Sequence, residues 1–129
     1  MRMRVFLDAN ILFSAAGTES KTANTLAKLI KNGHEAVTNS YAWDEAADNL
    51  TKKRPHTLGT LEKLRGLVKI IDDTKPYLTF DCEEKDRQIL AGAIGAGCSH
   101  LWTDDTKHFG MFYGRRIHDV LVVPSVPLE

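Results

Sequence analysis

The sequence predicts an α/β domain built around a mostly parallel sheet. Short apolar runs typical of strands alternate along the chain with longer segments that have the apolar spacing of helices, and this alternation is the signature of that class. No Pro/Gly-rich linker or internal repeat interrupts it. A length of 129 residues suits one hydrophobic core, so we expect residues 1–129 to form a single domain.

The first predicted elements are a strand over about residues 4–7 and a short helix over about 10–16. Ser20 is a typical N-cap for the next helix, whose apolar face repeats at helical spacing until Gly33 ends it. Residues 34–38 then predict a short strand.

The middle of the chain predicts two helices and a strand. Ser40 is the expected N-cap of a helix that Pro55 stops, because proline lacks the amide hydrogen and its ring clashes inside a helix. Leucines at three-residue spacing over 58–64 predict a further helix, and residues 67–71 predict a strand.

The last third of the chain predicts a helix and two strands. Asp81 and Glu84 have the spacing of a capping box for a helix that runs to Gly97, and apolar runs over 100–103 and 120–123 predict the strands. In sheets of this class, ligands bind outside the carboxyl ends of the strands. Residues with a chemical role are therefore expected directly after each apolar strand.

Composition argues against a membrane protein and favours a cytoplasmic one. No run approaches the ~20 apolar residues of a membrane span, and the N-terminus does not resemble a secretory signal. Cys82 and Cys98 do not form a C-x-x-C motif, so reduced thiols are expected. The 17 basic side chains balance 17 acidic ones, which argues against a dedicated nucleic-acid-binding module but leaves a nuclease open, because local basic patches matter more than net charge.

Carboxylates stand where a parallel sheet places its ligand site. Asp8 directly follows the apolar run 5–7, and Asp104 and Asp105 directly follow the run 101–103. One acid after a strand is common as a helix N-cap. Two such strand ends in one chain favour a shared site at the sheet edge.

Helix phase places a third acid. Ile89, Leu90, Ala93 and Ile94 form one apolar stripe, and at about 100° per residue Asp86 falls near its middle. We expect Asp86 to lie beyond the first helical turn and to point inward. It either reaches a site beneath the helix or is a buried side chain with a satisfied hydrogen bond.

The segment SYAWDEAADNL holds three further acids, Asp44, Glu45 and Asp48, and their phase alone predicts a solvated helix face.

Carboxylates that converge in one cleft rise in pKa unless a cation lies among them. Oxygen ligands without a Cys or His cluster favour Mg²⁺ or Mn²⁺, and one or two such ions support phosphoryl displacement by water.

Three stretches resemble the PIN domain family: FLDANIL near the N-terminus, DEAADNL in an early helix, and KDRQILAGAIGAGCSHLWTDDTKHF near the C-terminus. The resemblance covers almost the whole chain, in the family's order. It implies a three-layer α/β/α fold and a metal-dependent ribonuclease that hydrolyses RNA phosphodiester bonds. It further implies a VapC-type toxin held in check by a cognate antitoxin, and a homodimer.

Carried over residue by residue, the resemblance makes Asp8, Glu45, Asp86 and Asp105 the catalytic acids that hold one or two Mg²⁺ or Mn²⁺ ions. Asp104 occupies a position usually held by a small or polar residue, so it is either an extra ligand or a neighbour.

Supporting roles fall to Asn10 and Thr103, which would position water or the ligating carboxylates. The basic stretch 52–54 (Lys52, Lys53 and Arg54) and His108 are candidates for RNA contacts. The basic stretch is explained equally well as a solvated helix end.

Other functions compete with the toxin. The same chain would suit RNA maturation or decay, or a non-catalytic RNA-binding PIN scaffold. A phosphatase of the haloacid dehalogenase type also has an aspartate after its first strand, but it needs a second one two positions after Asp8, where this chain has Asn10. Manganese-dependent cleavage of single-stranded RNA, suppressed by EDTA, separates the nuclease from the scaffold.

Overall fold

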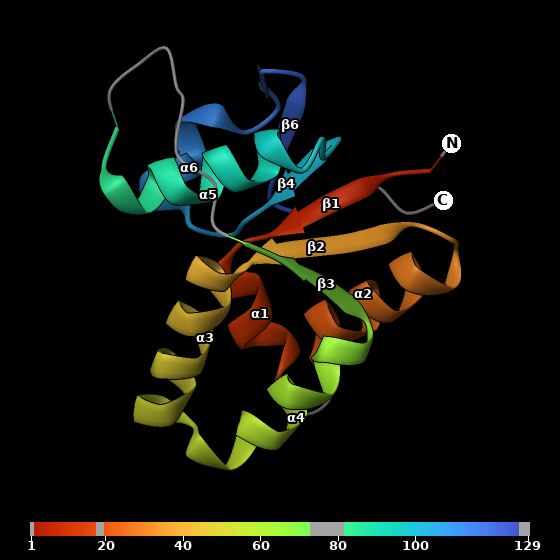
Figure 1. The fold of residues 1–129 in the computed structure, drawn as a ribbon, viewed down its shortest axis with the longest axis vertical. Coiled ribbons are helices and arrows are strands. Elements are labelled where there is room, and N and C mark those ends of the chain that lie inside the picture. Colours follow the sequence, from red (N-terminus) through yellow and green to blue (C-terminus); the bar gives the residue numbers. More distant parts are fainter. Residues whose placement is uncertain (1, 18–19, 73–81, 127–129) are drawn as a thin grey trace.

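Figure 1 shows the computed structural model, which describes residues 2–17, 20–72 and 82–126. Within these residues, six strands form one sheet in the order β3-β2-β1-β4-β6-β5. They are β1 (Arg4–Leu7), β2 (Glu35–Asn39), β3 (Val68–Ile71), β4 (His100–Trp102), β5 (Arg116–Ile117) and β6 (Val120–Val123). All neighbouring pairs are parallel except β5 with β6, so the predicted α/β class is confirmed.

The helices cover both sides of the sheet. They are α1 (Ala9–Ala15), α2 (Lys21–Lys31), α3 (Ser40–Lys53), α4 (Leu58–Lys63), α5 (Glu84–Gly95) and α6 (Thr106–Phe109). In Figure 1, α1 to α4 lie on one side of the strands and α5 and α6 on the other, which is the expected three-layer arrangement. None of the helices in the described ranges is both long and apolar enough to cross a membrane.

The central strands are apolar on both faces because helices cover both. Phe6 and Leu7 of β1 and Leu101 of β4 are fully buried, as is typical of parallel strands. The register between β1 and β4 pairs Leu7 with Trp102. The residues that follow these two strands therefore emerge next to each other at the carboxyl edge of the sheet.

Gly92 allows α5 to lie close against the sheet. A Cβ atom at this position would lie 2.6 Å from Nδ2 of Asn39 and 2.9 Å from Cε2 of Phe6, so only glycine fits without a shift of these neighbours. The side-chain amide of Asn39 also donates a hydrogen bond to the carbonyl of Gln88 over 3.1 Å. These contacts fix α5, and with it the residues of its first turn, relative to β1 and β2.

One predicted helix cap is confirmed and one is wrong. The Ser20 hydroxyl accepts a hydrogen bond from the backbone N–H of Ala23 and caps α2. Ser40 does not cap α3, because Asn39 holds the extended cap conformation and accepts a hydrogen bond from the N–H of Ala42 over 2.9 Å. Asparagine and serine are about equally good caps, so local sequence did not decide between them.

The fifth helix begins later than a capping box at residue 81 requires. Asp81 itself lies outside the described residues, and Glu83 precedes α5 without a side-chain cap bond. Since α5 starts at Glu84, Asp86 lies in its first turn and not beyond it, which corrects the prediction. Strand β5 and helix α6 were not predicted, because two and four residues are too few to show a period.

Candidate active site

Asp8 lies at the carboxyl end of β1 and caps the N-terminus of α1. Its Oδ1 accepts a hydrogen bond from the N–H of Ala9 over 2.7 Å, and its Oδ2 accepts one from the hydroxyl of Thr103 over 2.8 Å. Only 1% of Asp8 is exposed. Asp8 is therefore a helix cap and, at the same time, a buried carboxylate at the edge where sheets of this class place their sites.

Burial raises the pKa of Asp8 from 3.8 to about 6, because a carboxylate loses its hydration inside a protein. The hydrogen bonds from Thr103 and Ala9 lower this pKa, and the negative charge of Glu45 raises it further. At neutral pH Asp8 is thus an ionised group that its surroundings compensate only in part. A cation beside it would stabilise it.

The side chains of Thr103 and Asn10 link the ends of β1 and β4. The Thr103 hydroxyl oxygen, which donates to Asp8, also accepts hydrogen bonds from the N–H of Asp105 over 3.2 Å and from Nδ2 of Asn10 over 3.4 Å. Oδ1 of Asn10 accepts a hydrogen bond from the backbone N–H of Asp104 over 3.3 Å. These bonds place the acids that follow the two strands in one network.

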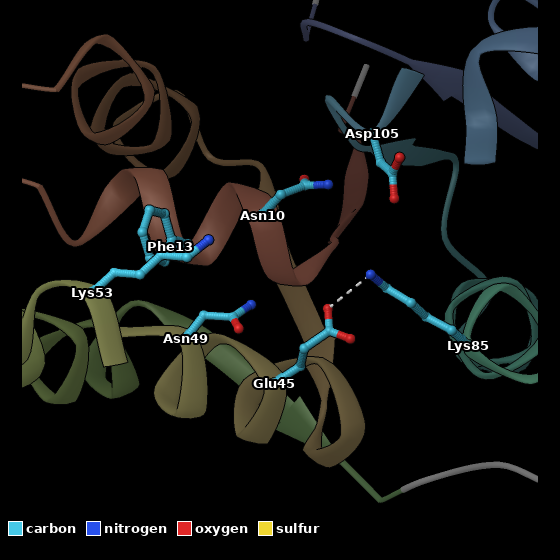
Figure 2. A pocket seen from close by; sticks show the side chains of 7 residues that line it. All are labelled: Asn10, Phe13, Glu45, Asn49, Lys53, Lys85 and Asp105. Atoms are coloured by element: carbon cyan, nitrogen blue, oxygen red, sulfur yellow. Dashed lines mark ion pairs between the residues drawn. The ribbon is translucent and has the colours of Figure 1, made fainter. Parts of the chain in front are cut away.

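A cavity of about 270 Å³, which we call the acid cavity, opens at this edge of the sheet (Figure 2). Its lining comes from α1, from α3, from the first turn of α5 and from the residues after β4. The lining residues are Asn10, Phe13, Glu45, Asn49, Lys53, Lys85 and Asp105. The charges of Glu45 and Lys85 both act on the pKa of Asp8, which places Asp8 within electrostatic reach of this cavity.

The two acids after β4 differ in their surroundings. Asp105 caps α6, since its Oδ1 accepts the N–H of His108 over 3.1 Å, and its side chain lines the acid cavity. Asp104 is largely exposed. The partial loss of hydration of its carboxylate, together with the negative charge of Asp105, raises its pKa. Asp105 is therefore the better placed of the two to serve the cavity.

Glu45 enters the acid cavity from α3, which corrects the prediction of a solvated face from helix phase alone. Asp44 and Asp48 are exposed, but Glu45 is half-buried because α5 packs beside α3. Its Oε2 lies 3.4 Å from Nζ of Lys85, which reaches across from α5 (Figure 2).

Lys85 is a residue of this site that sequence reasoning missed. Burial acts to lower its pKa, but the carboxylates of Glu45, Asp8 and Asp105 outweigh burial and raise it. The one available signal was position, because Lys85 directly precedes Asp86 at the start of α5. Successive helix residues point about 100° apart, so two neighbours serve two different faces.

Asp86 is buried as predicted, but in the described structure it lines a hollow next to the acid cavity and not the cavity itself. Its Oδ2 lies 3.1 Å from Nδ1 of His108. Its Oδ1 is buried and has no hydrogen-bond partner among the described residues. Since His108 also donates its backbone N–H to Asp105, this histidine connects Asp86 with the acid cavity.

The basic residues at the end of α3 reach the cavity in part. Lys53 lines it, with Nζ 5.9 Å from the centroid of the Phe13 ring, and the guanidinium of Arg54 lies 5.2 Å from the same ring. Lys52 is exposed and is not part of the cavity lining in the described structure.

The donor set at the acid cavity fits a hard divalent cation. Glu45 and Asp105 line the cavity and Asp8 lies within electrostatic reach of it, and all three have carboxylate oxygens, the ligand type that Mg²⁺ and Mn²⁺ prefer. The unpartnered Oδ1 of Asp86 is a further oxygen donor whose hydrogen-bonding capacity the described residues leave unused. Asp86 lies in the same cluster as Glu83 and His108, whose ligand atoms are within 4.8 Å of one another.

Two solved structures share this fold over most of their length. The VapBC2 complex from Rickettsia felis, bound to a DNA fragment from its promoter, contains a chain that matches with a TM-score of 0.67 and 16% identity, covering 93% of this chain and 97% of that one. VapC20 from Mycobacterium tuberculosis, described as a sarcin-ricin loop cleaving toxin, matches with a TM-score of 0.60 and 11% identity, covering 83% and 94%. At these identities the likeness shows the fold.

No curated protein matches the sequence significantly. The family model described as PIN domain matches residues 4–107, a span that runs from the start of β1 into α6 and includes all four predicted acids. This match covers most of the chain and agrees with the resemblance of its three motifs. The chain belongs to the PIN domain family.

Proposed function

We propose that this protein is a divalent-metal-dependent endoribonuclease. The proposal is supported mainly by one observation: Glu45 and Asp105 line one cavity at the carboxyl edge of the sheet, and the buried carboxylate of Asp8 lies within electrostatic reach of Glu45. Like charges so placed repel one another unless a cation joins them. Membership of the PIN domain family supports the same chemistry.

The proposed ligands are Asp8, Glu45, Asp86 and Asp105, with Asp104 as a neighbour able to assist. These carboxylates would hold a Mg²⁺ or Mn²⁺ ion, and the chemistry supplied by such an ion would be activation of water and stabilisation of charge on phosphodiester oxygens. Asp86 has an oxygen to offer, because its Oδ1 lacks a partner in the described part of the chain.

The remaining residues of the network position these acids. Thr103 and Asn10 hold the Oδ2 side of Asp8 through bonds of 2.8 and 3.5 Å, and Thr103 also holds the backbone of Asp105. A carboxylate that keeps its place without an ion does not have to reorganise when one binds, which favours binding.

RNA is proposed to approach along the basic end of α3. Lys53 brings an ammonium group into the acid cavity, and Lys52 and Arg54 are exposed next to it. Phosphate contacts from such side chains give affinity without sequence preference. His108 lies beside Asp105 and Asp86 and is the fourth proposed contact.

We further propose that the nuclease is the toxin of a VapBC-type pair, acting in the cytoplasm and restrained by a cognate antitoxin. The support is the fold shared with a chain of the VapBC2 complex and with VapC20, which is described as a sarcin-ricin loop cleaving toxin. A homodimer is part of the same proposal. An RNA-processing nuclease outside any such pair is the main alternative.

The test is cleavage of labelled single-stranded RNA by the purified protein with Mn²⁺ and with EDTA, alongside the Asp8→Asn variant. We expect cleavage with Mn²⁺, none with EDTA, and at least a hundredfold loss in Asp8→Asn. RNA binding without cleavage under every condition would instead identify a non-catalytic scaffold. Full metal-dependent activity of Asp8→Asn would refute the assignment of Asp8.

A further inference from the structure

Lys85 brings a positive charge into a site built from carboxylates. It stands in the first turn of α5, and Figure 2 shows its side chain extending toward Glu45, with Asp105 nearby. Nζ lies 3.4 Å from Oε2 of Glu45, and the two side chains are 37% and 27% exposed. The pair is therefore partly shielded from water, which strengthens its attraction relative to a surface ion pair.

The charge of Lys85 acts on more than its direct partner. The electrostatic influence of Glu45, Asp8 and Asp105 reaches its ammonium group, and Lys85 in turn stabilises the ionised form of Asp8. Lys85 thus supplies part of the compensation that the three carboxylates require in the described structure. A divalent ion among these acids would supply the same compensation.

Glu45 cannot serve Lys85 and a divalent ion equally well. The carboxylate that pairs with Lys85 is also a proposed metal ligand, and two cations competing for it repel each other. The contact with Lys85 uses Oε2 of Glu45, and a divalent ion bound to the same carboxylate would weaken it by charge repulsion.

The released ammonium group has a second anion to turn to. It carries three donors on a flexible stem of four carbons and faces the cavity where the RNA phosphate is to react. Lys53 also lines the cavity, but its ammonium group lies beside the Phe13 ring, whereas that of Lys85 lies beside the carboxylate of Glu45.

We propose that Lys85 is an internal counter-ion that exchanges Glu45 for a substrate phosphate when a divalent ion enters the acid cavity. This inference rests on the proposed nuclease function. It predicts effects of opposite sign on metal and RNA binding when the charge of Lys85 is removed. Simple damage to the fold would weaken both.

The experiment compares wild type, Lys85→Met, Lys85→Arg and the matched control Lys53→Met, which removes one charge from the same cavity. Mn²⁺ binding is followed by the electron paramagnetic resonance of the free ion, without RNA. We expect Lys85→Met to bind Mn²⁺ about tenfold more tightly and Lys53→Met less than about twofold, since Coulomb repulsion falls with distance and solvent exposure. Lys85→Arg keeps the charge and should remain within about twofold of wild type.

RNA binding is measured by fluorescence anisotropy with a short labelled single-stranded RNA in Ca²⁺. We expect Lys85→Met to bind this RNA about fivefold more weakly, because it loses one electrostatic contact with a phosphate. Lys85→Arg should restore most of the affinity. Circular dichroism and thermal unfolding confirm that each variant is folded.

Unchanged or weaker Mn²⁺ binding in Lys85→Met overturns the exchange, and so does unchanged RNA affinity. If wild type binds Mn²⁺ and Asp8→Asn does not, while Lys85→Met equals wild type, the exchange fails and the nuclease proposal stands. If wild type itself shows no saturable Mn²⁺ binding that Asp8→Asn removes, the proposed function fails and the exchange fails with it.

Discussion

The hydroxyl of Thr103 donates a hydrogen bond of 2.8 Å to the carboxylate of Asp8, although 95 positions separate the two residues in the sequence. Both are buried, and each directly follows a strand of the same parallel pair. This bond is the closest side-chain link between the N-terminal acid and the residues that follow β4. It also opposes the effect of burial on the pKa of Asp8.

We expect Thr103→Val to destabilise the fold by about 1 to 3 kcal/mol. Valine has no hydroxyl, so Oδ2 of Asp8 and the N–H of Asp105 each lose a hydrogen bond. Thr103→Ser keeps the hydroxyl and should cost less than about 1 kcal/mol. Urea unfolding of the three proteins measures both values. Equal stabilities of Thr103→Val and Thr103→Ser would show that the hydroxyl contributes nothing.

We expect Asp8→Asn, without metal and at neutral pH, to be more stable than wild type by about 1 to 3 kcal/mol. The rise in pKa from 3.8 to about 6 corresponds to roughly 3 kcal/mol disfavouring the ionised form in the folded state. Because the folded-state pKa is the higher one, wild-type stability falls as the pH rises from about 4 to about 6. The gain in Asp8→Asn should therefore vanish below about pH 4.

Chemical unfolding at several pH values in EDTA measures this difference. Mn²⁺ should stabilise wild type and leave Asp8→Asn nearly unchanged, since a ligand stabilises only the state that binds it. A variant less stable than wild type at neutral pH in EDTA contradicts the prediction.

We expect Asp86→Asn to lower the pKa of His108. The hydrogen bond from Asp86 raises that pKa most, and the charges of Asp86, Asp105 and Glu83 add to the rise while burial opposes it. Since the folded-state pKa is raised, the stabilisation by His108 is complete below the ordinary histidine pKa and is lost as the pH rises through the raised one.

Proton NMR titration of the imidazole follows this pKa directly. Glu83→Gln is the matched control, because Glu83 lies 3.5 Å from the same nitrogen but its side chain is 72% exposed. Its effect should be the smaller of the two. If the His108 pKa falls as much or more in Glu83→Gln than in Asp86→Asn, Asp86 is not the main cause of the raised pKa.

We expect Gly92→Ala to destabilise the fold by about 1 to 3 kcal/mol, because its Cβ would overlap Asn39 and Phe6. Gly59→Ala in α4 is the control, since a Cβ there meets nothing within 4 Å. Alanine should stabilise that helix by about 0.5 kcal/mol. Thermal unfolding distinguishes the two, and a neutral Gly92→Ala would mean that α5 can move away from the sheet at little cost.

The placement of Asp8 and Asp105 was predictable because it depends on short-range information. Each acid follows an apolar strand, and parallel strands deliver their carboxyl ends to one edge. Thr103 and Asn10 were assigned supporting roles from the resemblance to the PIN domain family, and both lie in the hydrogen-bond network of Asp8. None of these positions requires knowledge of how a helix docks.

The other half of the site depends on contacts that helix phase does not contain. Phase put Glu45 on a solvated face, but α5 packs beside α3 and half-buries it. The position of α5 rests on the contact of Gly92 with β1 and β2. The ion pair of Lys85 and the pairing of Asp86 with His108 follow from that docking and from the short helix α6, and neither leaves a periodic signal.

The pairing of Leu7 with Trp102 limits the insertions and deletions that this sequence can accept during evolution. Strand side chains alternate between faces, so inserting or deleting one residue in β4 would turn Thr103 away from Asp8. Length variation is then tolerable in the loops but not between residues 100 and 105. Any homologue that keeps the hydrogen bond between Thr103 and Asp8 has to keep this spacing, however far the rest of its sequence diverges.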